Sequence, residues 1–295
     1  MRAFTHFACV DWSGAVGERL AGIAAALCGQ GDAAPLLVRP AHRWSRQDVL
    51  DWLLGEMPAD TLVGLDLSPA LPFADAGAYF PRHDEPHDEP HDEPRNARAL
   101  WALVDTICAG DPHLGVDAFV DHLVYSRYFR RHAGRTGDAF GDRGGGRLRV
   151  VEGRQRAMGL SPYSCFNLVG AAQVGKSSLT GMRVLHRLRG AIPVWPFDPV
   201  PATGPLIVEI YTTIAARAAG VRAGTSKIRD AVALDAALGS LGSRPHTPLA
   251  RYTDHATDAL LTAAWLRSVT HDADLWSPPG LDAVARTEGW TFGVR

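Results

Sequence analysis

The sequence predicts an α/β fold whose mixed sheet has three antiparallel strands followed by parallel strands, with helices on either side. Short apolar runs of strand length, separated by turn residues, fill residues 1–70. Runs with helical periodicity dominate the chain after residue 160. A chain of 295 residues with 46% hydrophobic content can bury a full core around such a sheet.

The first three strands are expected at residues 4–12, 18–29 and 35–41. Residues 4–12 form an apolar run that ends in a carboxylate, and its length suits a central strand better than a helix. Composition leaves residues 18–29 open to strand or helix, but the Ser-Gly turn before them favours a hairpin. The second strand is therefore expected to pair antiparallel with the first.

A helix and a fourth strand follow. Ser45 can cap a helix that Pro58 ends, and residues 61–67 form a buried strand ending in Asp66. Three strands, a helix and a fourth strand is the order in which an RNase H-like domain begins. Residues 1–73 are thus expected to be the first half of such a domain.

Residues 74–160 break this pattern and are expected to be a large insertion. A triple HDEP repeat at 83–94 carries a proline at every fourth position, so we expect a solvated loop there. A helix is expected at 97–109. The second half of the domain is assigned to residues 161–295, with strands at 164–170 and 206–211 and helices at 177–190, 226–241 and 253–269.

Carboxylates mark three of the expected strands. Asp11 and Asp66 end apolar runs, and Glu209 lies inside the run 206–211. A carboxylate at the end of a buried strand is costly unless it is paired or bound to metal. We expect Asp11 and Asp66 to lie on neighbouring strands, placed to share a metal ion.

A further acidic group lies on the last long helix. Asp258 follows Asp254 by four residues and His255 by three, so both are on its face. Converging oxygen ligands suit Mg²⁺ or Mn²⁺, two of which can activate water and stabilise the leaving oxygen of a phosphodiester. His255 is a candidate for proton transfer. The alternative is that Asp254 only caps the helix and His255 is a surface residue.

Five short motifs resemble domain-of-unknown-function family 429, whose members are described as predicted RNase H-like nucleases. They are VDWSGA (10–15), GLDLSPALPF (64–73), VEIY (208–211), HATDALLTAAWL (255–266) and EGWTFGV (288–294). HATDALL also resembles the last helix of RuvC-type resolvases. The resemblance implies a metal-binding role for Asp11, Asp66 and Asp258, with Glu209 a less certain ligand. It skips most of residues 74–160, and Thr212 stands where relatives usually have proline.

A competing motif lies at residues 170–177. GAAQVGKS matches the phosphate-binding pattern G-x-x-x-x-G-K-[ST], in which Lys176 and Ser177 would contact a nucleotide. The flanking residues supply a candidate strand and helix, but only the two framing glycines are present and no strand ending in Asp follows. A third possibility is that Lys176 and the helix N-terminus bind a substrate phosphate within a nuclease.

Two segments are candidates for binding nucleic acid or metal. The stretch Arg127–Arg156 holds nine arginines with interleaved aromatic residues, an arrangement that can follow a nucleic-acid backbone or equally pair with carboxylates elsewhere. The histidines of the HDEP repeat, His83, His87 and His91, could bind metal. A slipped-repeat expansion in a loop explains them more simply.

Overall composition narrows the class of protein. A net charge of −2 gives no global attraction to nucleic acid or anionic lipid, so a local patch must supply any such contact. Four dispersed cysteines without a CxxC pair argue against a zinc knuckle or a disulfide scaffold. No apolar segment is long enough to span a membrane. We expect a soluble, cytoplasmic protein.

The leading hypothesis is a divalent-metal phosphodiesterase, a nuclease, in which Asp11, Asp66 and Asp258 bind Mg²⁺ or Mn²⁺. Glu209 would assist, and His255 would handle protons. One rival is an NTP-binding enzyme that uses residues 170–177, through a P-loop or through the sugar-kinase variant of the same fold. A second rival is an inactive nucleic-acid-binding or structural protein that keeps the scaffold alone.

Overall fold

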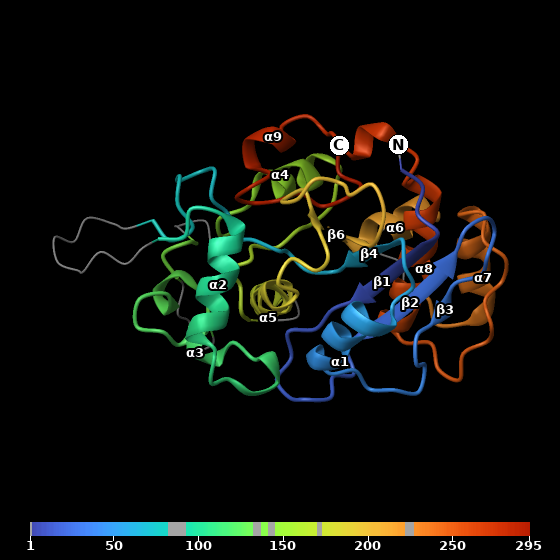
Figure 1. The fold of residues 1–295 in the computed structure, drawn as a ribbon, viewed down its shortest axis with the longest axis horizontal. Helices are drawn as coiled ribbons and strands as arrows, with labels where there is room; N and C mark the ends of the chain where they lie inside the picture. Colours follow the sequence, from blue (N-terminus) through green and yellow to red (C-terminus); the bar gives the residue numbers. More distant parts are fainter. Residues whose placement is uncertain (1, 82–92, 132–136, 141–144, 170–172, 222–226) are drawn as a thin grey trace.

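The computed structural model describes residues 2–81, 93–131, 137–140, 145–169, 173–221 and 227–295. A six-stranded mixed sheet, in the order β3-β2-β1-β4-β6-β5, forms its centre (Figure 1). The strands are β1 (His6–Asp11), β2 (Ala24–Gly29), β3 (Leu36–Leu37), β4 (Thr61–Leu65), β5 (Val194–Trp195) and β6 (Leu206–Glu209). β1, β2 and β3 pair antiparallel, whereas β4, β6 and β5 pair parallel. The predicted fold class is confirmed.

Alternation along β1 explains why this strand is central. Phe7 and Cys9 face one hydrophobic core, while Ala8 and Val10 face the other, and all four are buried. A strand that buries both faces reads as a continuous apolar run, which is what residues 4–12 show. Between His6 at its start and Asp11 at its end, β1 is wholly apolar.

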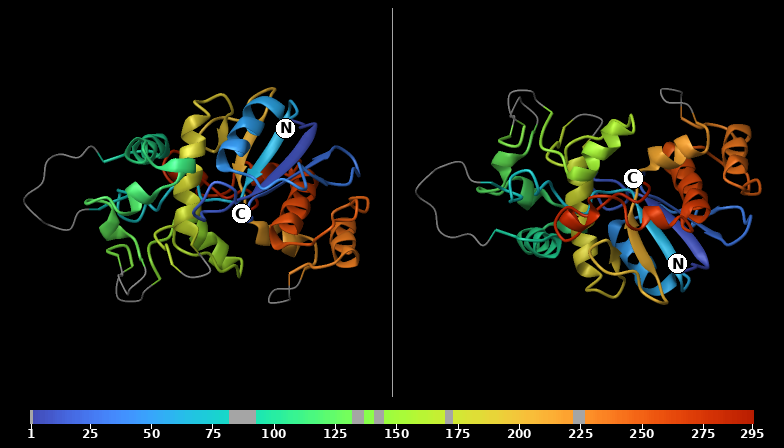
Figure 2. Two further views of the ribbon diagram at one scale, coloured as in Figure 1. Left: turned by 90° about the horizontal axis from the view of Figure 1, so that it is seen from below. Right: turned by 90° about the horizontal axis from the view of Figure 1, so that it is seen from above.

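Helices cover both faces of the sheet (Figures 1 and 2). On one face lie α6 (Thr212–Ala218), α7 (Ala231–Ser240) and α8 (Asp254–Val269), with α8 packed directly on β1 and β2. The other face carries α1 (Arg46–Asp51), its π-helical extension (Trp52–Glu56), α2 (Ala97–Ile107) and α5 (Val174–Arg187). Shorter helices are α3 (Asp117–Val120), α4 (Val150–Ala157) and α9 (Leu281–Val284), with 3-10 turns at Pro112–Leu114, Ser126–Tyr128 and Ala273–Leu275.

Side-chain caps mark the starts of α1 and α8. Ser45 caps α1 and forms a capping box with Asp48, as the sequence suggested for its N-terminus. Thr253, not Asp254, caps α8, and its side chain accepts from the amide of Ala256. The reading of Asp254 as the N-cap is therefore wrong, and Asp254 lies in the first turn, where a negative charge is favoured.

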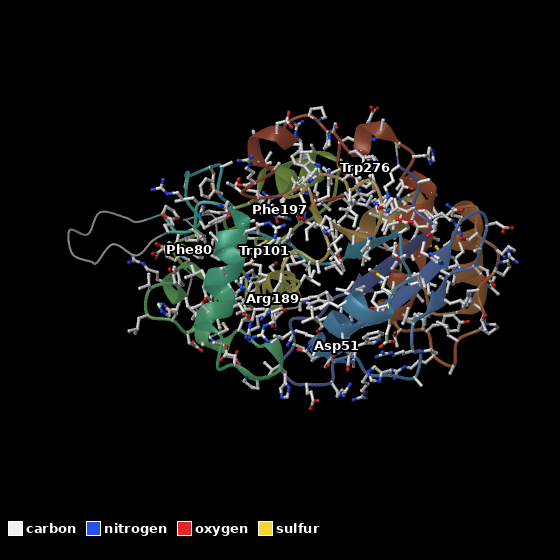
Figure 3. All side chains as sticks on the ribbon, in the orientation of Figure 1. Asp51, Phe80, Trp101, Arg189, Phe197 and Trp276 are labelled. Atoms are coloured by element: carbon white, nitrogen blue, oxygen red, sulfur yellow. The ribbon has the colours of Figure 1, made fainter. Side chains whose placement is uncertain are left out.

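The central part of the chain packs into the same core as the α5 face of the sheet. α2 lies against α5, and the Trp101 ring on α2 meets Phe197 at a centroid distance of 5.3 Å (Figure 3). Phe80 lies at the far side of α2 and contacts the rings of Tyr125 and Tyr128. The segment 93–131 is thus tied to the sheet through buried aromatic and aliphatic contacts.

The local structure differs from the sequence prediction in two ways. Residues 164–170 do not form a strand in their described part, where only an isolated bridge joins Asn167 to Arg130. The helices α4 and α6 were not expected from the sequence, because both are short and lack a long apolar period. The HDEP repeat lies almost wholly outside the described residues, and its histidines are not among them. Within the described residues, no helix is both long and apolar enough to cross a membrane.

Candidate functional site

Asp11 and Asp66 lie side by side at the carboxyl edge of the sheet. Asp11 is the last residue of β1, and Asp66 directly follows β4, the parallel neighbour of β1. The amide of Asp66 donates to the carbonyl of Val10 at 3.0 Å, which continues the ladder and fixes the backbone beside Asp11. The predicted placement of this pair on neighbouring strands is confirmed.

His255 joins this edge from the first turn of α8. Its Nδ1 lies 2.7 Å from Oδ1 of Asp11, and the Asp11 side chain is almost fully buried while that of His255 is 42% exposed. Gly22 lies beside the ring, where a Cβ would be in ordinary contact with Nε2 of His255 at 3.4 Å but only 2.9 Å from Oγ of Ser13. The alternative of a purely superficial His255 is wrong, because its ring bonds a buried carboxylate.

Asp258 approaches the same edge, but a cation holds it. Lys227 donates from Nζ to Oδ2 of Asp258 at 2.7 Å. Arg229, two residues further on, pairs with Asp254. Both cationic side chains are more than half exposed, so one short segment ahead of α7 balances two of the α8 carboxylates from the solvent side.

The carboxylates act on each other electrostatically. Burial raises the pKa of Asp66 well above its ordinary value, and the charges of Asp11 and Asp258 raise it further. Burial also raises the pKa of Asp11, against the opposing effect of the His255 hydrogen bond. The hydrogen bond to Asp11 in turn raises the pKa of His255. These mutual effects show that the three aspartates share one electrostatic environment.

Asp66 is the least compensated of these groups. Thr212, at the start of α6, is the polar neighbour that donates to it, and the Thr212 hydroxyl lies 3.5 Å from Oδ2. Among the described residues no Lys, Arg or His side chain forms an ion pair with Asp66. A nearly uncompensated carboxylate beside two others is the arrangement that a bound cation stabilises.

The carboxylates of Asp11, Asp66 and Asp258 have the right chemistry to bind a hard divalent cation, but they are too far apart to bind one ion together in this arrangement. Three carboxylates from separate elements offer only oxygen ligands, which Mg²⁺ and Mn²⁺ prefer. In the described part of the chain, however, no three His, Cys, Asp or Glu side chains are close enough to hold one ion. Lys227 forms a hydrogen bond to the carboxylate of Asp258. Its ammonium group must therefore move away before Asp11, Asp66 and Asp258 can bind a metal ion together.

Glu209 does not belong to this group of free carboxylates. Arg149 binds it through two hydrogen bonds, of 2.8 Å from Nη1 and 2.5 Å from Nη2, and the hydroxyl of Thr291 donates to it at 2.7 Å. Arg149 also bonds Glu152 at its own helix start. The expectation that Glu209 lies ready to assist a metal is wrong in this arrangement, since its oxygens are held by the buried guanidinium.

A cleft of about 410 Å³ opens beside Asp66. Its walls come from the turn after β1, the start of α5 and the ends of β4 and β6, and its floor carries Arg149 and Glu209. Asp11 and Asp258 do not line it. The cleft therefore offers access to the acidic edge from the Asp66 side, where Ser13, Ser177 and Tyr211 supply further polar groups.

The GAAQVGKS motif is placed beside the cleft but does not have the surroundings of a nucleotide-binding loop. A helix follows as expected, but α5 begins at Val174, three residues before the expected start, and Ser177 lines the cleft. The strand expected before the motif is absent, and residues 170–172 lie outside the described residues. Nζ of Lys176 lies 3.9 Å from Asp117 and does not line the cleft.

Several arginines of Arg127–Arg156 have structural partners. Arg127 and Arg131 pair with Asp138 and Asp121, and Arg147 binds Asp75 as well as three carbonyl groups. The interleaved aromatic residues, Tyr125, Tyr128, Phe129 and Phe140, are buried in the core and not available for stacking on bases. The expectation that those aromatics face a ligand is wrong.

Sequence reasoning missed two residues that define the electrostatics. Lys227 is one of only two lysines in the chain, a signal that was present but pointed to no partner. Arg149 lies 60 positions from Glu209 and inside an arginine-rich stretch, so nothing local distinguished it from its neighbours.

Neither a scan against protein-family models nor searches of the curated proteins and of the solved structures find a match to this chain. The function of this chain must therefore be inferred from the chemistry of the site itself.

Proposed function

We propose that this chain is a divalent-metal-dependent phosphodiesterase, specifically a nuclease. The observation that supports it is that Asp11, Asp66 and Asp258, from the ends of two parallel strands and from a helix, act on one another electrostatically at one edge of the sheet. Their repulsion costs stability unless a cation binds. The same fold neutralises Glu209 with an arginine, so the lack of such a partner at Asp66 is a feature that function would explain.

The three aspartates would hold Mg²⁺ or Mn²⁺, and the bound metal would supply an activated water and stabilisation of the leaving oxygen. His255 is bonded to Asp11 through Nδ1, so its Nε2 is the nitrogen that can take up or release a proton. Thr212 orients Asp66 through its backbone amide. Lys227 holds Asp258 until a cation replaces it.

Single substitutions at the sheet edge test the proposal. In Asp66→Asn and Asp11→Asn we expect Mn²⁺-dependent cleavage of labelled DNA and RNA, single-stranded, double-stranded and branched, to fall more than roughly 100-fold. Isothermal calorimetry of the same variants should show that Mn²⁺ binding is lost. Both substitutions keep the shape of the side chain and remove its charge.

The matched control is Asp282→Asn, which removes an exposed carboxylate on α9, away from the sheet edge. Its cleavage and metal binding should equal those of the unchanged protein. If cleavage survives in both Asp11→Asn and Asp66→Asn, the nuclease mechanism is wrong.

A further inference from the structure

A second pocket, of about 440 Å³, adjoins the cleft that contains Asp66. Pro162 and Tyr163 line both hollows, so they form a shared wall between them. Beyond this wall the pocket is lined by Arg130, Arg156 and polar groups that include Ser161. Two cationic side chains therefore face a hollow next to the proposed catalytic edge.

These two arginines differ from four others in the same stretch, and they line the pocket, whereas the likewise exposed Arg154 does not. Arg127, Arg131, Arg147 and Arg149 each bind a carboxylate. Arg130 and Arg156 are exposed, and among the described residues neither forms an ion pair. Their positive charge is available to a ligand.

The backbone holds Arg130 in place although its side chain is exposed. Its amide donates to the carbonyl of Phe166, and its carbonyl accepts from Leu168, both at 3.0 Å. Arg156 stands on the last turn of α4, whose first turn is held by the buried Arg149 and Glu152. Both arginines thus project from positions fixed by buried contacts.

Tyr163 gives the shared wall its chemical character. Its side chain is 56% exposed, the most exposed of all the Phe, Tyr and Trp side chains, every one of which lies in the described part of the chain. An exposed aromatic ring costs free energy in water and is typical of a stacking surface. It stands between a cationic hollow and an acidic one.

We propose that Arg130, Arg156 and Tyr163 form a binding subsite for single-stranded nucleic acid next to the Asp66 cleft. The two guanidinium groups take a backbone phosphate, and Tyr163 stacks on the base between that phosphate and the nucleotide at Asp66. This inference rests on the proposed nuclease function. It narrows the substrate to a strand with unpaired bases, since a base within a duplex has no free face for the ring.

Fluorescence anisotropy in EDTA tests binding separately from cleavage. The probes are fluorescein-labelled single-stranded DNA and RNA of about 12 nucleotides, in about 50 mM salt. We expect Arg130→Gln/Arg156→Gln to weaken binding roughly tenfold. The slope of log affinity against log salt should fall by about 0.7, since one contacted phosphate of a single strand contributes about 0.7. Tyr163→Ala should weaken binding several-fold, while Tyr163→Phe should not.

The control variant, Arg189→Gln/Arg244→Gln, removes the same charge elsewhere. Arg189 follows the C-terminal end of α5, whose N-terminal end lines the cleft, and Arg244 pairs with Asp32 beyond β2, at the sheet end opposite Asp11. Affinity and salt slope should match those of the unchanged protein. Thermal melts confirm that each variant is folded.

Equal affinities in the two double variants overturn the subsite, as does failure of the unchanged protein to bind either probe. A mononucleotide that competes as well as the oligonucleotide would show a small-molecule site instead, and would also overturn it. Because no metal is present, this result is independent of whether Asp66→Asn abolishes cleavage.

Discussion

Two groups of buried acidic side chains meet at one cleft of this fold. The carboxylates of one group are neutralised by an arginine or by backbone amides, whereas Asp66 in the other has no cationic partner among the residues that the structure describes. Around Arg149, two glutamates receive charged hydrogen bonds, and Glu288 accepts from the amides of Phe73, Ala74 and Val150. Around Asp66, by contrast, the neighbours are two more aspartates and a threonine. The group around Arg149 stabilises the packing of distant segments, because each carboxylate oxygen of its three glutamates accepts a hydrogen bond.

The difference teaches where the fold accepts a loss of stability. Arg149 and its partners connect α4, β6 and the C-terminal segment, so their charges are part of the core. The aspartates at the sheet edge have fewer such links, one from Asp11 to His255 and one from Asp258 to Lys227. Burial raises the pKa of Asp11 and of Asp66, and the charges of neighbouring aspartates raise it further. An unfavourable arrangement that the structure could have neutralised is typical of a site that awaits a ligand.

The largest expected effect is on the free energy of unfolding, when Arg149 is removed from its buried glutamates. Arg149→Met removes the guanidinium but leaves Glu152 and Glu209 buried, so the free energy of unfolding should fall by about 3–5 kcal/mol in urea denaturation. The control Arg127→Met breaks the more exposed pair with Asp138 and should cost no more than about 1 kcal/mol. Similar losses in both variants would contradict the contrast between the two groups.

The opposite sign is expected at Asp66. Asp66→Asn should raise the free energy of unfolding at pH 7, without metal, by about 1–3 kcal/mol, because it removes a buried charge from beside Asp11 and Asp258. The folded pKa is raised, so the unchanged protein loses stability as pH rises from the unfolded value near 3.8 toward the folded one. The advantage of the variant should therefore vanish below that unfolded value.

Melts of Asp66→Asn and the unchanged protein across pH check this sign. The exposed control Asp282→Asn should shift neither the melting temperature nor its pH dependence. A variant that is less stable than the unchanged protein at pH 7 would show that Asp66 is a structural partner.

A smaller effect is expected from the cation that holds Asp258. Lys227→Met frees this carboxylate, so Mn²⁺ should bind roughly five- to tenfold more tightly in calorimetry. Lys176→Met is the matched control, because it removes the other lysine of the chain, whose ammonium group pairs with Asp117 and not with Asp258. Weaker binding in Lys227→Met would mean that the ammonium group supports the metal site.

The smallest effect concerns His255. Its pKa should exceed the ordinary value of 6.5 in an NMR titration and move back toward it in Asp11→Asn, while Asp274→Asn should leave it unchanged. The ion pair between His255 and Asp11 contributes stability that is fully present below the unfolded pKa. That contribution is lost as pH rises through the raised folded pKa. An unchanged titration in Asp11→Asn would show that the 2.7 Å contact is not formed in solution.

Local patterns were enough to predict the framework and the first half of the candidate site. Apolar runs ending in carboxylates placed Asp11 and Asp66 at strand ends, because strand length and the turn after Asp11 are local properties. That the two strands are neighbours was expected from the RNase H-like order of the elements, and the pairing of β1 with β4 confirms it. The body of α5 and the whole of α8 were likewise visible as helical periods, although α5 begins three residues earlier than expected.

Partners distant in sequence could not be predicted in the same way. Nothing near Glu209 indicates that Arg149 reaches it, and nothing near Asp258 points to Lys227, 31 residues earlier. The aromatic residues beside the arginines read as a ligand surface until their burial against α2 and α5 is known. In each case the tertiary fold, not the local pattern, decides which side chain faces which.

The close packing of Gly14 against Ser177 links the two sides of the cleft. A Cβ on Gly14 would lie 2.4 Å from the amide nitrogen of Ser177, so the turn after β1 rests directly on the first residues of α5. Gly14 stands three positions after Asp11, and Ser177 lines the cleft. The turn that follows Asp11 and the start of α5 are therefore packed against each other with no room for a side chain between them. A ligand that pushes the start of α5 toward β1 would press on this turn.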